Sequence, residues 1–550
     1  MSPPARIDPD EWFASNVAGG TASGPTTPPD GFPDTVPDAD DQPPANPRGR
    51  PTGNVATRIT ALATELFDFG ITPGGEAYAV PWNGPRHLAQ PLRNPSGGQS
   101  IRQELAAAWF DKTGTTAPNQ ALADALTTLE GLAQRRPPTE AALRVASYGG
   151  AAWLDLGDQQ GRVLRIGPDG WAVVTDAVPV LFRRTALTAP MPVPERAGTL
   201  DELWRFVNVA PADRPLVLSA LVACLACPDQ PQPIMALSGE PGTGKTTAAI
   251  RLASIVDAST VGPQAPPRDP DAWLDLAKSW RVIQLDNLSR MPEWLADMLC
   301  RAVTGDGFTR RKLYTDDGLV VQRFRRFVIL TAVDLGALRA DLNDRSLVVR
   351  LQPIPPARRA TDQALAADWA CAYPRVFGAL ADLAASVLHL MGSAECPVVA
   401  DPPRMADFAK VLACVDAILG TSALAAYIAQ SADLAAETIA TSPFLAALTE
   451  AARPQMGTSA ELLAALRPTE PDWREPRGWP KTSRQATTLL RHNAIALRYG
   501  GWQVDELPRG GHDKSVRWDI RPPSANPCAA CGQPILPDLW AAGERTHATC

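Results

Sequence analysis

The residues best suited to chemistry lie in a glycine-rich segment, 239–246, that reads GEPGTGKT. Glycines let backbone N–H groups turn towards phosphate oxygens, a lysine reaches the β- and γ-phosphates of a nucleotide, and a threonine hydroxyl ligates Mg²⁺. The flanking segments predict a strand at 234–237 and a helix at 247–256, which a chance glycine-rich turn would not require. The sequence therefore predicts a site for ATP and Mg²⁺. Its predicted residues are Gly239, Glu240, Pro241, Gly242, Thr243, Gly244, Lys245, Thr246 and Thr247.

A second apolar segment ends in an acid, as a nucleotide site requires. Residues 281–285 predict a buried strand that ends at Asp286, whose carboxylate would hold Mg²⁺ through water. An ordinary acid at the end of a strand is the alternative. Asn287 comes next, and an amide can orient a water molecule but cannot take its proton. The general base is therefore left open, with Glu293 and Asp297 nearby in the sequence.

Thr331 and Arg345 complete the predicted catalytic set. Thr331 ends a third apolar strand, 326–331, which is the place for a sensor of the γ-phosphate. Arg345 precedes a further apolar strand and has two interpretations. It is either an arginine finger that stabilises charge in a neighbouring subunit's site, or the partner of Asp341 or Asp344 in a surface salt bridge. The predicted catalytic residues are Lys245, Asp286, Asn287, Thr331 and Arg345.

A basic hairpin is predicted at residues 303–318. Residues 301–326 contain seven Arg or Lys and three Asp, whereas the whole chain has a net charge of −7. Much of that negative charge lies in the first 50 residues, which hold eight acidic residues and three Arg. Contact with phosphates depends on local charge, because salt screens charges over about 10 Å. The acidic total therefore does not exclude DNA as a partner, although a solvated turn with surface charge is the alternative for this hairpin.

The order of these motifs resembles that of the superfamily 3 helicases, a branch of the AAA+ ATPases found in viruses, phages and plasmids. Only 89 positions separate Lys245 from Asp334. They contain the strand-ending acid, a Gly-Asp pair before the basic hairpin, and the polar-ended strand. Residues 285–317 and 402–412 are more closely similar to ATPases of actinobacterial phages and integrated elements, known as ATP-binding or primase-associated helicase proteins. The resemblance covers about residues 140–520.

This resemblance implies a ring, commonly a hexamer, with one hairpin per subunit pointing into a central channel. Matched by position, Arg310, Arg311 and Lys312 would grip the phosphates of single-stranded DNA, and ATP hydrolysis between subunits would move the hairpins. A separate primase is a further implied partner. Asn287 departs from the acidic pair that is usual in the family, which puts fast hydrolysis in doubt.

A winged helix is predicted at residues 478–520, which have the pattern of two helices followed by a hairpin. Such a domain can bind duplex DNA. Its candidate phosphate contacts are Arg484, Arg491, Arg509 and Lys514. A winged helix that binds protein is the alternative.

The last residues of the sequence predict a structural Zn²⁺ site. Two pairs of ligands with two-residue gaps can surround one tetrahedral ion, and metal binding would supply the folding energy that such a short segment lacks. The predicted ligands are Cys528, Cys531, His547 and Cys550. Chance cysteines in a tail are the alternative. Cys224 and Cys227 have the same spacing but lie in an apolar helical run, so buried thiols are expected there.

The predicted fold class is α/β, and a length of 550 residues suggests three or four domains. The N-terminal module is expected to start with a helix over 55–69 and to contain antiparallel hairpins at 141–185. The predicted divisions are a disordered acidic Pro-rich tail (1–52), an accessory module (53–195), an AAA+ P-loop ATPase (196–355), a helical segment (356–440), a winged-helix-like domain (441–522) and a zinc-binding segment (523–550).

Composition and patterning narrow the class of protein. The hydrophobic content is 45%, the mean hydropathy is −0.12, and we find no uninterrupted apolar run near 20 residues, so a membrane-spanning chain is not expected. The N-terminal residues lack a basic segment followed by an apolar one, so a secretory signal is not expected, and the nine Cys are widely spread, which favours the cytoplasm. Asp155 and Asp158 are interpreted as turn acids, so primase activity is not predicted.

The sequence thus predicts an ATP-dependent DNA helicase or translocase that replicates a phage, plasmid or integrated element. Two alternatives remain. One is an AAA+ loader or switch that does not translocate, which Asn287 favours and the basic hairpin opposes. The other is a DNA-binding regulator whose ATPase core controls assembly.

Overall fold

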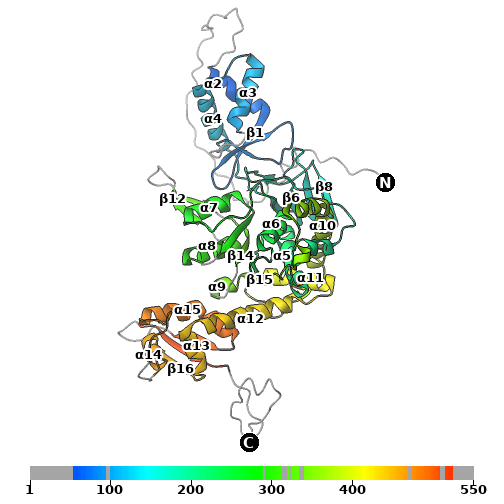
Figure 1. The fold of residues 1–550 in the computed structure, drawn as a ribbon. Coiled ribbons are helices and arrows are strands. Elements are labelled where there is room, and N and C mark those ends of the chain that lie inside the picture. Colours follow the sequence, from blue (N-terminus) through cyan, green and yellow to red (C-terminus); the bar gives the residue numbers. More distant parts are fainter. Residues whose placement is uncertain are drawn as a thin grey trace, which may run out of the picture. The chain divides into compact units, whose positions relative to one another are not determined.

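The protein is described by a computed structural model that covers most of residues 54–523. The described ranges are 54–93, 100–288, 291–305, 308–311, 319–322, 324–332, 340–468, 473–507 and 515–523. Lys312, Arg509, Lys514 and the predicted zinc ligands Cys528, Cys531, His547 and Cys550 lie outside them, as does the predicted tail. The described residues belong to one compact unit, and Figure 1 labels many of their helices and strands.

The N-terminal layer packs three helices against a small antiparallel sheet. Its elements are α2 (Val55–Leu66), β1 (Phe67–Ile71), β2 (Ala77–Pro81), β3 (Gln90–Pro91), α3 (Ile101–Thr113) and α4 (Asn119–Ala133). The prediction of one helix over 55–69 was wrong at its end, because the chain becomes extended at Phe67. Phe67 and Phe69 are buried on either side of Asp68, and this alternation suits a strand better than a helix.

A four-stranded antiparallel meander follows, as the sequence predicted for residues 141–185. Its strands are β5 (Val145–Tyr148), β6 (Ala151–Asp155), β7 (Val163–Gly167) and β8 (Gly170–Val174), and a short parallel pair, β4 (Ala141–Ala142) and β9 (Leu181–Phe182), lies beside it in the sequence. Leu154, Leu164 and Ile166 belong to the same hydrophobic core as Leu221 and Leu380. Residues 59–133 have a separate core of their own. The segment predicted as one module is therefore divided between two cores.

The central domain is a parallel sheet with helices, in agreement with the predicted α/β class. Its strands are β10 (Ile234–Ser238), β11 (Val282–Leu288), β14 (Phe327–Ala332) and β15 (Ser346–Arg350), in the order β11-β14-β10-β15. Its helices are α5 (Arg214–Ala226), α6 (Lys245–Ser254), α7 (Pro270–Ser279), α8 (Glu293–Thr304) and α9 (Ala340–Asn343), with 3₁₀ turns at Leu200–Arg205, Pro211–Asp213 and Pro356–Arg358. The strands are almost wholly buried, as is typical of a parallel sheet covered on both faces. Parallel strands bring their carboxyl ends to one edge, where ligands of such sheets bind.

The basic segment forms the predicted pair of strands. β12 (Phe308–Arg311) and β13 (Leu319–Gln322) are antiparallel, with Arg310 opposite Val320 and Arg311 opposite Leu319. Lys312 and the rest of the connection, 312–318, are outside the described residues.

Three helices follow the sheet: α10 (Asp362–Met391), α11 (Ala406–Leu419) and α12 (Ala423–Thr441). Among the described residues, α10 is the one helix whose length and apolar composition would allow it to cross a membrane, which the sequence analysis did not expect. In this structure 67% of its most apolar stretch is buried inside the protein. Core helices of soluble proteins pass the same test, so α10 is weak evidence for a membrane span.

Helix α12 protects the edge strand of the central sheet through one side chain. The buried Gln430 amide accepts from the N–H of Val348 at 2.8 Å and donates to the carbonyl of Val348 at 2.5 Å. Gln430 thus replaces the neighbouring strand that β15 lacks on this side.

Replacing Gln430 by leucine is expected to lower the free energy of unfolding by about 2–3 kcal/mol, because both buried groups of Val348 lose their partner. Urea unfolding measures this, with Gln120→Leu as the control, since Gln120 bonds Asp124 on an exposed face of α4. A loss as small as that of the control would contradict the role of Gln430.

The described residues of the C-terminal part form three helices and a three-stranded antiparallel sheet. The elements are α13 (Pro443–Glu450), β16 (Gln455–Thr458), α14 (Ser459–Ala465), α15 (Ser483–Tyr499), β17 (Gln503–Leu507) and β18 (Arg517–Arg521), with strand order β16-β18-β17. The sequence analysis predicted the hairpin of β17 and β18 and missed β16. Its expectation of two helices over 478–520 was wrong, because the described residues of this range form one helix, α15. The strand β16 has only four residues and no regular apolar alternation, so its pairing with β18 is not visible in the sequence.

The thiols of Cys224 and Cys227 are buried in and next to α5, as expected. Burial raises the pKa of Cys224 to about 11 and that of Cys227 to about 12, since a thiolate is poorly solvated there. Groups of His, Cys, Asp and Glu that could hold a metal ion do not occur among the described residues. Both thiols therefore act as core side chains.

Candidate nucleotide site

The glycine-rich loop joins the end of β10 to the start of α6. Gly242 and Gly244 have φ angles of 83° and 80°, a left-handed conformation that costs about 1–2 kcal/mol for other residues. These turns allow α6 to begin at Lys245, two residues earlier than the sequence predicted. The Lys245 ammonium donates to the carbonyls of Gly239 at 2.6 Å and Glu240 at 2.9 Å. The loop is thus a compact turn at a helix N-terminus, where anions are favoured.

Three side chains from three different elements meet beside this loop. The hydroxyl of Thr246 lies 3.1 Å from each carboxylate oxygen of Asp286. The hydroxyl of Thr331 donates to the same carboxylate and is itself almost completely buried. Since hydroxyl and carboxylate oxygens are the ligands that Mg²⁺ prefers, the group has the chemistry of a magnesium site.

The strand order explains why these three residues meet. Strand β14 lies between β10 and β11, so Thr331 at its end stands between the loop and Asp286. The pairing of β11 with β14 shifts register between Leu285 and Leu288, which is where Asp286 and Asn287 lie. The backbone N–H of Asn287 donates to the Thr331 hydroxyl at 2.9 Å. This irregularity orients Asp286, and its position could not be read from the sequence.

Asn287 occupies a left-handed position, with φ of 55° and an exposed side chain. Asparagine and glycine tolerate this conformation better than other residues. Replacing Asn287 by alanine is therefore expected to lower the free energy of unfolding by about 1 kcal/mol, while Asn287→Gly keeps most of the stability. Denaturant unfolding of the two variants checks this. Equal stability of the alanine and glycine variants would contradict the backbone argument.

Arg345 lies before the first residue of β15, whereas the loop follows the last residue of β10, so the two are at opposite ends of these neighbouring parallel strands. Its carbonyl accepts from the N–H of Ile234, and the next residue, Ser346, pairs with Ile234 at the start of β10. The loop begins after Ser238, about 13 Å further along this strand. Arg345 is therefore not placed to act on the loop of its own chain. Asp344, one of the partners considered for it, lies 3.9 Å from Arg404.

Arg350 is a cation near the loop that the sequence analysis missed. It ends β15 opposite Ser238, which directly precedes the loop, and its side chain is exposed. The backbone N–H of Arg350 donates to the Asp213 carboxylate at 3.3 Å, and burial raises the pKa of that carboxyl above its ordinary value. The signal in the sequence was a charged residue at the end of an apolar strand, the same signal that identified Asp286.

The other predicted contacts are not brought to this site. Arg310 and Arg311 lie on β12, in a separate two-stranded sheet. In the C-terminal part, Arg484 is exposed near the start of α15, and Arg491 is paired with Glu506 through two hydrogen bonds of 2.8 and 2.6 Å. Glu506 therefore already neutralises one of the two described candidate contacts of that domain.

Two family models match consecutive parts of the chain. Residues 200–437 match the actinomycete integrative conjugative element replication protein, and residues 444–531 match the C-terminal domain of the same type of protein, AICE RepA. Together the two matches cover more than half of the 550 residues. The chain belongs to this replication protein family. These matches support the part of the predicted resemblance that concerns replication, since they identify a replication protein of a mobile element.

Solved structures give a more distant likeness to this replication protein. The C-terminal region of NrS-1 in an apo form has 11% identity and a TM-score of 0.35, over 85% of this chain and 99% of that one. A JCV helicase with a bound acetamide compound has 12% identity and a TM-score of 0.21, over 43% of this chain and 65% of that one. Such low TM-scores do not bear on activity. The search of curated proteins gave no match.

Proposed function

We propose that this replication protein is an ATP-driven translocase that moves single-stranded DNA during replication of its element. The observation that carries the proposal is the contact of Thr246, next to Lys245, with both oxygens of Asp286 at 3.1 Å. This contact joins the phosphate-binding loop to a strand-ending acid from another part of the sheet. Site residues of this kind are the ones that phosphoryl transfer uses for positioning and charge neutralisation.

The residues present fit ATP and Mg²⁺. Thr246 and Asp286 supply oxygen ligands, and Lys245 has the charge and the length to exchange its two loop carbonyls for the β- and γ-phosphates. Thr331 donates to Asp286 and would be the sensor of the γ-phosphate. When bound, Mg²⁺ neutralises the charge that develops on the transferred phosphoryl group. Asn287 would orient the attacking water, and the general base is not assigned.

DNA is the proposed partner of the basic hairpin, and a ring of subunits, a hexamer by analogy, is the proposed assembly. The antiparallel pairing of β12 and β13 supports a protruding hairpin with Arg310 and Arg311 in its first strand and Lys312 directly after it. The helices and antiparallel sheet of 443–521 support a winged helix. Cys528, Cys531, His547 and Cys550 are proposed to bind a structural Zn²⁺. A separate primase would complete the replication machinery.

A loader or switch that hydrolyses ATP without moving along DNA is the second candidate. The observation that favours it is Asn287, since an exposed amide follows Asp286 where a second carboxylate would serve as a base.

A strand-displacement assay decides between the two. The wild-type protein is expected to displace a strand only with ATP and Mg²⁺. Lys245→Ala should lose both ATPase activity and displacement, whereas Lys312→Ala should keep ATPase activity without DNA and lose displacement. Lys112→Ala, far from the hairpin in sequence and paired with Glu65 on the surface, is the matched control. ATP hydrolysis that never displaces a strand would favour the loader.

A further inference from the structure

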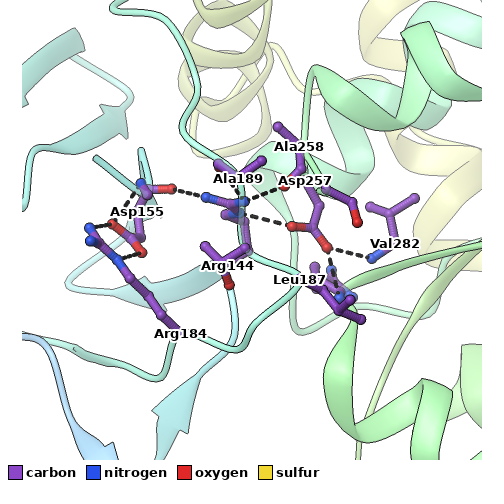
Figure 2. Close-up of polar contacts among 12 residues, drawn as sticks. Arg144, Asp155, Arg184, Leu187, Ala189, Asp257, Ala258 and Val282 are labelled. Carbon is purple, nitrogen blue, oxygen red and sulfur yellow. Dashed lines mark hydrogen bonds and ion pairs between the residues drawn. The ribbon is translucent and has the colours of Figure 1, made fainter. Parts of the chain in front are cut away.

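A buried arginine joins the antiparallel meander to the central domain. Arg144 precedes β5, and only 1% of its side chain is exposed. Its Nε donates to Asp257 at 2.9 Å, and its other nitrogens donate to the carbonyls of Asp155, Ala189 and Ala258 at 3.1, 2.9 and 2.6 Å. Figure 2 shows the guanidinium among these acceptors, with Asp257 on one side and Asp155 on the other.

Asp257 connects Arg144 to two elements of the nucleotide site. Its second carboxylate oxygen accepts from the N–H groups of Arg281 and Val282, at 2.9 and 3.1 Å, where β11 begins. Its own N–H donates to the carbonyl of Ala253 at the end of α6. Asp257 thus contacts the last turn of α6 through its backbone N–H, and through its carboxylate it contacts the first residue of β11 and the guanidinium of Arg144 (Figure 2).

The opposite ends of these two elements carry the candidate catalytic groups. Helix α6 begins with Lys245 and Thr246 and is about 15 Å long. Strand β11 reaches Asp286 about 13 Å beyond Val282. Both are rigid elements. The distance between the last turn of α6 and the first residue of β11 therefore affects the distance between Thr246, at the start of α6, and Asp286, near the end of β11. Breaking the buried pair would also leave an uncompensated buried charge, which destabilises the contact between these elements.

We propose that Asp257 is a positioning residue for the nucleotide site, and that the antiparallel meander acts on this site through the Arg144–Asp257 ion pair. The proposal rests on the proposed function, since it requires that ATP binds between α6 and β11. It gives residues 141–191 a role in ATP binding, although they lie outside the parts of the chain that match the family models.

A matched control exists in the same meander. Arg184 forms two hydrogen bonds with the carboxylate of the buried Asp155, at 2.8 and 2.7 Å, whereas Arg144 contacts only the backbone carbonyl of Asp155, so the ion pair of Arg184 does not involve the central domain. Arg184→Met therefore breaks a buried ion pair of the meander, while Arg144→Met breaks the pair that reaches α6 and β11. Asp257→Asn tests the same link from the other side. Its amide oxygen can still accept from Val282, but its NH₂ group faces the donor of Arg144.

The experiment measures the affinity of each full-length variant for AMP-PNP with Mg²⁺, together with the melting temperature with and without this probe. Arg144→Met and Asp257→Asn are expected to weaken AMP-PNP binding about fivefold or more, in the range of ordinary site-to-site coupling. The rise in melting temperature on AMP-PNP binding should shrink accordingly. Arg184→Met should lower the melting temperature but keep the affinity of the wild type. Arg144→Lys should recover part of the affinity.

If the wild-type protein binds AMP-PNP and both Arg144→Met and Asp257→Asn bind it with the same affinity, this proposal is overturned and the nucleotide site is not. A wild-type protein that does not bind AMP-PNP would overturn the nucleotide site and this proposal with it. If a variant does not fold, hydrogen exchange of the wild-type protein replaces it. The amides of Arg281 and Val282 donate hydrogen bonds to the Asp257 carboxylate, and they should exchange more slowly when AMP-PNP is bound. Unchanged exchange would count against the coupling.

Discussion

Replacing Asp286 by asparagine is expected to lower the rate of ATP hydrolysis at least about a hundredfold without unfolding the protein. Asparagine has nearly the same shape and can still accept from the hydroxyls of Thr246 and Thr331. It lacks the negative charge that would hold Mg²⁺ beside the phosphates. The loss should therefore appear in ATP turnover at saturating Mg²⁺, measured by phosphate release.

The control for this substitution is Asp169→Asn. Asp169 is an exposed acid in the turn between β7 and β8, where it pairs with Arg165. Its replacement should leave ATP turnover unchanged. Melting curves of both variants show whether folding is preserved. If Asp286→Asn hydrolysed ATP like the control, the contact of Thr246 with Asp286 would be a structural hydrogen bond and not a metal site.

Replacing Arg345 by alanine is expected to lower ATP turnover about a thousandfold, the lower end of the effect of an arginine finger. Arg345 lies at the start of β15, and the loop before Lys245 follows the end of β10, so the two are at opposite ends of these parallel strands. As the predicted arginine finger, it would act on a nucleotide that is bound to another subunit. AMP-PNP affinity should change much less than turnover, because the finger acts mainly in the transition state.

Mixing two inactive variants tests this arrangement. Lys245→Ala lacks a working loop but has Arg345, and Arg345→Ala has the loop but lacks the finger. Mixed assemblies contain interfaces with one intact loop and one intact arginine, so ATPase activity should return when the two proteins are combined. Absence of recovery, in mixtures shown by cross-linking to contain both variants, would favour a local salt-bridge role for Arg345.

Local patterns predicted the parts of the site that a few consecutive residues define. The glycines, Lys245 and Thr246 form one motif, and Asp286 and Thr331 each end an apolar strand, so their arrival at one sheet edge follows from parallel strands. The contact of Thr331 with Asp286 depends on β14 lying between β10 and β11. The order of strands in a sheet is not encoded in any one segment, and neither is the register shift that turns Asp286 towards Thr331.

The contacts that the sequence analysis missed join residues far apart in the chain. Arg144 and Asp257 are 113 positions apart, and Gln430 and Val348 are 82 positions apart. Before the fold is known, a buried arginine and a surface arginine look alike in a sequence, and so do a buried and an exposed glutamine. The end of α2 was missed for a different reason, since the apolar spacing of 55–66 continued into Phe67 and Phe69, where burial against β2 favours a strand.

The shared core of the meander and the central domain has a consequence for recombination between related elements. The first family match begins at residue 200, yet Leu154, Leu164 and Ile166 pack in the same core as α5 and α10. A crossover between two homologous genes near residue 200 would combine halves of one core that had not evolved together. A crossover between α4 and β4, at 134–140, would leave this core and that of residues 59–133 each intact, and would divide two smaller clusters, in which Tyr78 packs with Leu181 and Leu88 packs with Phe182. Functional chimaeras are therefore expected to have their junctions at 134–140, and the N-terminal layer is the part that such elements can exchange.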